Sequence, residues 1–165
     1  MKIPITILTI LIFVFAETAV SGQINDEHIR QLVLEKGIID SLFVFGKWTE
    51  NGQTENHLKY LGFVKTKGGQ TYKIVNSIWY WGLSHRATSR ILLFNEKNQY
   101  VGKYCVTSIN DLPTRLENEN LIFDNLVNGC DKNLKTIVNL SNGLPSSFFR
   151  KCNGRYGDIY KLEFD

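Results

Sequence analysis

The sequence pattern after Leu58 constrains the fold most strongly, because short apolar segments alternate there with turns rich in Gly, Asn and Asp. Three such turns are Lys67-Gly68-Gly69-Gln70, Glu96-Lys97-Asn98 and Asn118-Glu119-Asn120. Short strands separated at this spacing are typical of antiparallel sandwiches and barrels. We therefore predict an all-β domain of about eight strands. A small barrel and a sandwich share this pattern, so both stay open at this point.

The segment before these strands predicts one short helix. Asn25-Asp26-Glu27 suits a helix start with acids in the first turn, and apolar residues follow at helical spacing from Ile29 onward. The helix is expected to end at Gly37. Residues 38–45 fit a helical start that becomes extended, and residues 46–57 fit a polar loop or an exposed hairpin.

The first 22 residues (1–22) have the pattern of a secretory signal peptide. Lys2 precedes an apolar run from Ile3 to Ala16, and Val20-Ser21-Gly22 supplies small residues before a cleavage point at Gln23. The apolar run is shorter than the roughly 20 helical residues that cross a bilayer. We expect removal of this leader to leave residues 23–165 as a single exported domain without a membrane span.

The charge pattern argues against a dedicated nucleic-acid partner. The formal net charge is +3, and Lys and Arg are dispersed from Arg30 to Lys161 with acids between them. Proteins that bind nucleic acids usually concentrate positive charge on one face. The expected partner is therefore a small molecule or a protein.

The cysteines predict one disulfide. The expected mature chain holds Cys105, Cys130 and Cys152, and export favours oxidation, which leaves one odd thiol. We predict the pair Cys130–Cys152, because the turn Ser141-Asn142-Gly143 between them indicates two antiparallel segments folded near their midpoint. The alternative is three buried free thiols. Cys105 is expected on a strand face, where a thiol is typically inert.

The densest cluster of large aromatic and polar side chains runs from Ile78 to Arg86. Trp and Tyr offer wide contact area with few rotatable bonds, and His85, Arg86 and Arg90 suit an anionic or hydroxyl-bearing ligand. Alternatively, these aromatic residues fill the core from one strand face and line the sheet surface on the other. The predicted ligand-binding residues are Trp48, Trp79, Tyr80, Trp81, His85 and Arg86.

Signals for catalysis and for metal binding are weak. The three histidines, His28, His57 and His85, are not spaced like metal ligands, and no G-x-S-x-G element is present, so neither a metal nor a cofactor is expected. A ribonuclease-like hydrolase would need His57 and His85 to converge beside Arg86, one imidazole removing a proton and the other returning it. Nothing in the sequence brings the two histidines together.

One four-residue element, Phe45-Gly46-Lys47-Trp48, resembles the G-x-W element that opens lipocalin-like barrels. The resemblance covers these residues and the expected strand count. It implies an up-and-down barrel that is closed at one end by the Trp and that carries a small apolar ligand. The leading expectation is nevertheless a secreted, non-catalytic binding module with an aromatic and basic surface or pocket. A small secreted hydrolase and a lipocalin-like carrier are the alternatives.

Overall fold

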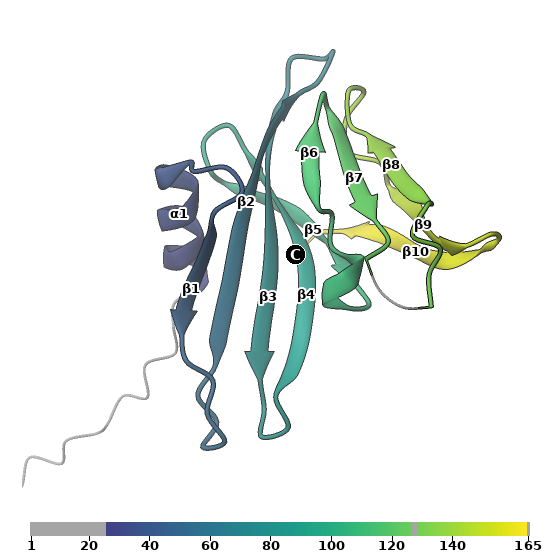
Figure 1. Ribbon diagram of the computed structural model, residues 1–165. Helices are drawn as coiled ribbons and strands as arrows, with labels where there is room; N and C mark the ends of the chain where they lie inside the picture. Colours follow the sequence, from purple (N-terminus) through teal and green to yellow (C-terminus); the bar gives the residue numbers. More distant parts are fainter. Residues whose placement is uncertain (1–25, 127–128, 165) are drawn as a thin grey trace, which may run out of the picture.

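The computed structural model describes residues 26–126 and 129–164, so the predicted leader lies outside the described residues. This part of the chain is mostly β-structure with one short α-helix (Figure 1). In chain order the elements are α1 (Asp26–Lys36), β1 (Leu42–Gly46), β2 (Glu55–Lys65), β3 (Thr71–Trp81), β4 (Arg86–Asn95), β5 (Tyr100–Val106), the 3-10 helix η1 (Ile109–Asp111), β6 (Arg115–Glu117), β7 (Asn120–Asp124), β8 (Lys135–Asn139), β9 (Ser147–Asn153) and β10 (Tyr156–Glu163).

The strands form two antiparallel sheets. The large sheet has seven strands in the order β1-β2-β3-β4-β5-β10-β9, and the small sheet has three in the order β6-β7-β8. The small sheet packs on one face of the large sheet and α1 packs on the other (Figure 1). Because β1 and β9 are opposite ends of the strand order, the large sheet stays open. The all-β prediction is confirmed, and the architecture is sandwich-like instead of a closed barrel.

Alternation along the long strands builds two apolar cores, one on each face of the large sheet. On β3, Ile74 lies in the core under the small sheet, and its neighbour Val75 lies in the core under α1. Phe123 fills the first core at 0% exposure and Phe94 fills the second at 1%. We call the two faces of the large sheet the small-sheet side and the helix side.

The predicted N-terminal helix is confirmed. It ends at Lys36, and the N–H of Gly37 donates to the carbonyl of Val33 at 3.1 Å. Gly37 has a φ of +60°, a conformation that glycine adopts without steric cost at a helix end. No helix in the described ranges is long and apolar enough to cross a membrane.

The segment after α1 differs from the prediction. Residues 38–45 do not begin as a helix, because the N–H of Asp40 donates to the Tyr60 carbonyl at 2.9 Å and β1, which begins at Leu42, then pairs with β2. The predicted polar loop is also shorter than expected, since β2 already begins at Glu55.

The predicted hairpin turns are confirmed. They connect β2 to β3, β4 to β5 and β6 to β7. In the last of these turns Asn118 and Glu119 have φ values of 47° and 59°, the left-handed conformation that suits a tight hairpin. The described residues contain ten strands, two more than expected from the apolar segments.

One predicted hairpin is wrong. β8 and β9, on either side of the turn at Asn142, do not pair with each other but belong to different sheets. The chain between them crosses from the small sheet to the large one, and two bonds hold this crossing in place. Tyr104 donates its hydroxyl to the Pro145 carbonyl at 2.6 Å, and the Leu162 N–H donates to the Ser146 carbonyl at 2.9 Å.

The predicted disulfide Cys130–Cys152 is confirmed, with the two Cα atoms 4.6 Å apart. The two cysteines meet because β8 and β9 still pack together where the sheets converge, and the Lys151 N–H donates to the hydroxyl of Thr136 at 2.9 Å. The bridge therefore fastens the connection between β7 and β8 of the small sheet to β9, an edge strand of the large sheet.

A buried ion pair joins the same edge strand to η1. The guanidinium of Arg150, 3% exposed, lies 3.0 Å from the Asp111 carboxylate and donates to the Asn110 carbonyl at 2.8 Å. Ser108 donates its hydroxyl to the second carboxylate oxygen at 2.8 Å. Both oxygens of the buried Asp111 carboxylate thus have partners, as burial of charge requires, whereas Arg150 Nε has no hydrogen-bond partner among the described residues.

Candidate functional site

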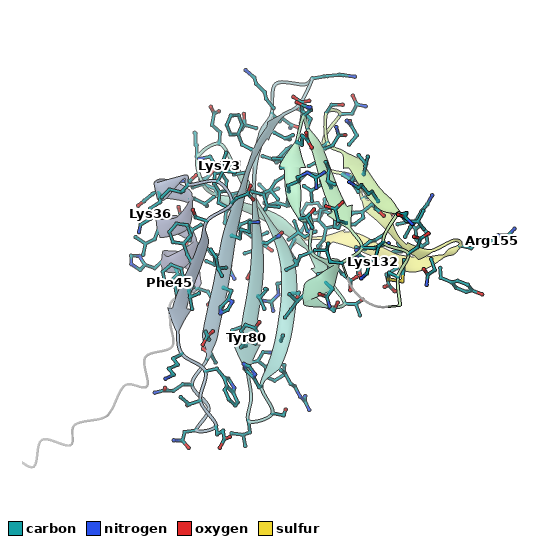
Figure 2. The ribbon with its side chains drawn as sticks, in the orientation of Figure 1. Lys36, Phe45, Lys73, Tyr80, Lys132 and Arg155 are labelled. Atoms are coloured by element: carbon teal, nitrogen blue, oxygen red, sulfur yellow. A yellow bond between two sulfur atoms is a disulfide. The ribbon has the colours of Figure 1, made fainter. Side chains whose placement is uncertain are left out.

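The ends of β1 to β4 nearest the β3–β4 turn project beyond α1 and beyond the small sheet (Figure 1). Tyr80 lies in this projecting end, and side chains there stand on both faces of the sheet (Figure 2). Strand alternation sorts consecutive residues onto opposite faces. The six predicted ligand-binding residues all lie here, but they are divided between the two faces, as the contacts below show.

The helix side of the projecting end carries two tryptophans and two arginines. The rings of Trp79 and Trp81 stack with centroids 5.6 Å apart and an interplanar angle of 22°. The guanidinium of Arg86 lies 5.6 Å from the Trp81 ring centroid, and that of Arg90 lies 5.9 Å from the Trp79 ring centroid. We call these four residues the Trp–Arg stack. Its order is Arg90, Trp79, Trp81, Arg86.

The pairing of β3 with β4 explains this order. Trp79 faces Thr88 across the two strands and Trp81 faces Arg86, so the four side chains share one face. The Trp81 indole N–H donates to the Thr88 hydroxyl at 2.9 Å, which fixes the ring. Both tryptophans are half-buried, and Arg86 is exposed.

Neither arginine of the stack forms an ion pair with a described residue. Within residues 26–126 and 129–164, no carboxylate lies within ion-pair distance of Arg86 or Arg90. A guanidinium seated on an aromatic ring retains its in-plane N–H groups for a carboxylate, sulfate or phosphate. The helix side therefore offers two available cations in a fixed arrangement.

The opposite face of the same end carries a second aromatic cluster formed by Trp48, Tyr80 and His85. The His85 ring lies between the other two, 4.2 Å from Trp48 and 4.8 Å from Tyr80 by ring centroids. The Trp48 indole N–H donates to the Gly82 carbonyl at 2.8 Å. These contacts fasten the β1–β2 loop to the β3–β4 turn.

A short carboxylate–imidazole pair borders this cluster. A Glu55 carboxylate oxygen lies 2.5 Å from His57 Nε2, and the other accepts the backbone N–H of Trp48 at 3.1 Å. The bond to His57, followed by the one to Trp48, lowers the pKa of the Glu55 carboxyl. Glu55 was missed from the sequence because residues 46–57 were expected to form a loop or an exposed hairpin. Glu55 and His57 in fact belong to β2, where residues two positions apart share a face.

Both histidines of the hydrolase hypothesis contact the Tyr80 ring, but the geometry of the two contacts differs. His57 meets the Tyr80 ring edge-on at 5.0 Å, whereas His85 stacks on it at 4.8 Å. Arg86, the proposed third member, lies on the helix side with Trp81. Among the described residues, no group of three or more His, Cys, Asp or Glu side chains is arranged to hold a metal ion.

Cys105 is a free thiol on the helix side of β5, paired in register with Arg90. Its sulfur donates to the Glu163 carboxylate at 3.4 Å. Burial, the bond to Glu163 and the charge of that carboxylate together raise the pKa of this thiol. A raised pKa disfavours the thiolate that a nucleophile requires.

A groove lies far from this site, between α1 and the β4–β5 turn. Gln31 donates to the Asn98 carbonyl at 2.8 Å across it, so helix and turn are tied together. None of the predicted ligand-binding residues contributes to its lining, which consists of Glu27, Arg30, Gln31, Phe94, Lys97, Asn98, Gln99 and Tyr100.

Comparison with known proteins adds no relationship to these observations. The Phe45-Gly46-Lys47-Trp48 element, which resembles a lipocalin opening, spans the end of β1 and the start of the β1–β2 loop in an open sheet, and the Trp48 indole donates to the Gly82 carbonyl. No family model, no curated protein and no solved structure matches the chain significantly.

Proposed function

We propose that this protein is an exported, non-catalytic binding module that contacts its ligand with the projecting end of β1 to β4. The observation that carries the proposal is the Trp–Arg stack. Two tryptophans and two arginines lie together on a face that extends beyond α1 and the small sheet (Figure 1). Trp and Arg are the residue types that most often dominate binding energy at interfaces.

The tryptophans are not needed to fill either core. The two apolar cores are built from other residues, with Phe123 and Phe94 among their fully buried members. Stacking and the Trp81–Thr88 bond hold the indoles in one arrangement before any ligand arrives. A pre-ordered surface loses less conformational entropy on binding, which favours recognition.

The two alternatives have less geometric support. A lipocalin-like carrier encloses its ligand in a barrel, whereas this sheet is open and both of its faces carry filled cores. A hydrolase of the two-histidine type needs one imidazole to remove a proton, the other to return one, and a cation on the phosphate between them. Here both imidazoles contact Tyr80, but Arg86, the expected cation, lies on the other face with Trp81.

Export is supported by the Cys130–Cys152 disulfide, because disulfides persist in oxidising compartments outside the cytosol. It also agrees with the leader predicted from residues 1–22. We propose that the protein acts outside the cytoplasm, where its binding face meets extracytoplasmic ligands.

The test is native mass spectrometry of the protein purified from its own secreting cells, before and after mild denaturation. The wild-type protein should carry an additional mass that denaturation releases. The double variant Arg86→Gln/Arg90→Gln should lose that mass. The matched control, Lys65→Gln/Lys67→Gln, removes the same charge from exposed positions at the opposite end of β2 and should retain it.

Equal retention of the bound mass by both double variants would place the binding site elsewhere. A wild-type protein without any releasable mass, combined with turnover of a phosphodiester substrate that is lost in His57→Ala, would replace the binding module with the hydrolase.

A further inference from the structure

We infer that the Trp–Arg stack binds a linear anionic polysaccharide, with uronate carboxylates or sulfate esters held by Arg86 and Arg90. The inference rests on the proposed function, since it names the ligand class for the same face. It follows from one juxtaposition, in which two guanidiniums without carboxylate partners lie at the two ends of a stacked indole pair.

The guanidiniums have the geometry for oxyanions. Each lies over an indole ring, at 5.6 Å for Arg86 and 5.9 Å for Arg90. Such seating restricts the long side chain and leaves the planar fork of N–H donors directed outward. A fork of this kind pairs with a carboxylate or a sulfate through two parallel hydrogen bonds.

The spacing of the two cations favours an elongated ligand. Arg86 and Arg90 are four positions apart on one face of β4, which places their Cα atoms about 13 Å apart. The stacked indoles lie beside this interval on β3. Two cations that start from backbone positions this far apart match a chain with repeated negative charges better than a single small anion.

The indole faces discriminate between classes of polymer. Single-stranded nucleic acids bind through bases that stack on free aromatic faces. Here Trp79 and Trp81 stack on each other, and a guanidinium lies over each of the two rings, so the ring faces already have partners. The stack therefore presents ring edges and guanidinium N–H groups, which suit a hydroxyl-rich anionic chain better than bases.

Exposure distinguishes this face from the centre of a protein interface. Such centres are usually apolar, with large side chains that become fully desolvated on binding. Trp79 and Trp81 are only partly exposed, and Leu83, which is 74% exposed, lies in the β3–β4 turn and in neither strand of the stack. A ligand of the stack therefore meets mainly the two guanidiniums, and the indole rings hold these guanidiniums in place.

The experiment measures binding of the purified full domain to five probes by biolayer interferometry at low and at physiological salt. The probes are heparin, polygalacturonate, neutral dextran, oligo(dT) and poly-glutamate. We expect heparin or polygalacturonate to bind most tightly, with affinity that falls as salt rises. Arg86→Gln/Arg90→Gln should weaken this binding by about tenfold or more, whereas Lys65→Gln/Lys67→Gln should change it less than about threefold.

The five probes distinguish results that support the inference from results that overturn it. Heparin binding alone identifies sulfate esters and polygalacturonate binding alone identifies uronates, and either supports the inference. Tighter Arg-dependent binding of oligo(dT) or poly-glutamate, or equal losses in the two double variants, overturns it. If no probe binds while the co-purified mass still depends on Arg86 and Arg90, the polysaccharide assignment is wrong and the binding module stands.

Discussion

Trp79 and Tyr80 are consecutive in the sequence but contact different clusters on opposite faces of β3. Trp79 stacks on Trp81 on the helix side, whereas Tyr80 packs between His57 and His85 on the small-sheet side. A single sequence motif thus serves two surfaces. Substitutions in one cluster should leave ligand contacts of the other cluster unchanged, which makes the two faces separable by mutation.

Trp81→Ala should remove a binding contact with a limited effect on stability. The side chain is half-buried at the projecting end, so we expect its loss to cost less than about 2 kcal/mol of unfolding free energy. Phe123→Ala, in the fully buried core, should cost about 3–5 kcal/mol. Urea unfolding of both variants checks this. Equal losses would show that Trp81 is a core residue and not a contact residue.

Arg150→Ala should destabilise the protein strongly. It removes a guanidinium that is 3% exposed and leaves the Asp111 carboxylate buried without its ionic partner. Breaking a buried pair in this way typically costs about 3–5 kcal/mol. Chemical denaturation provides the measurement, with Arg115→Ala as the control, because that side chain is 39% exposed and solvent screens its ion pairs, so its loss should cost far less. Similar losses in the two variants would contradict the assigned role.

Removal of the disulfide should lower stability by about 3 kcal/mol, the chain-entropy value for a bridge between residues 22 positions apart. Cys130→Ser/Cys152→Ser is the variant, and thermal and urea unfolding are the measurements. Cys105→Ser is the control and should stay close to wild type, since this thiol makes one weak bond to Glu163. A large loss in the control with none in the double variant would be inconsistent with this assignment.

The Glu55–His57 pair should make stability depend on acid pH. The folded protein holds the pKa of Glu55 below its ordinary value of 4.5, so the unfolded chain takes up the proton first as pH falls. The contribution of this carboxylate is therefore complete above pH 4.5 and is lost as pH falls through the lower, folded pKa. Glu55→Gln should be less stable than wild type at pH 6, by less than about 1 kcal/mol because the pair is partly exposed. Unfolding curves between pH 6 and pH 3 should converge, and a constant difference would refute the linkage.

Short-range patterns in the sequence predict the local features of this protein. The spacing of apolar residues and turns predicted an antiparallel β-domain, and the acids before Ile29 and the glycine at residue 37 predicted α1. These features depend on strand alternation, helix ends and chain reversal, which a linear pattern records directly. The cysteine count and the expected export predicted one disulfide, and the pair Cys130–Cys152 is correct although β8 and β9 do not form the hairpin from which it was inferred.

Long-range packing sets which strands pair and which side chains share a face. β8 and β9 flank a turn yet join different sheets, because the crossing at Pro145 is held by contacts with Tyr104 and Leu162 from distant strands. Arg150 finds Asp111 through the same long-range packing. The aromatic motif was visible in the sequence, but its division into two clusters depends on the register of β3 with β2 and β4, which non-local pairing sets.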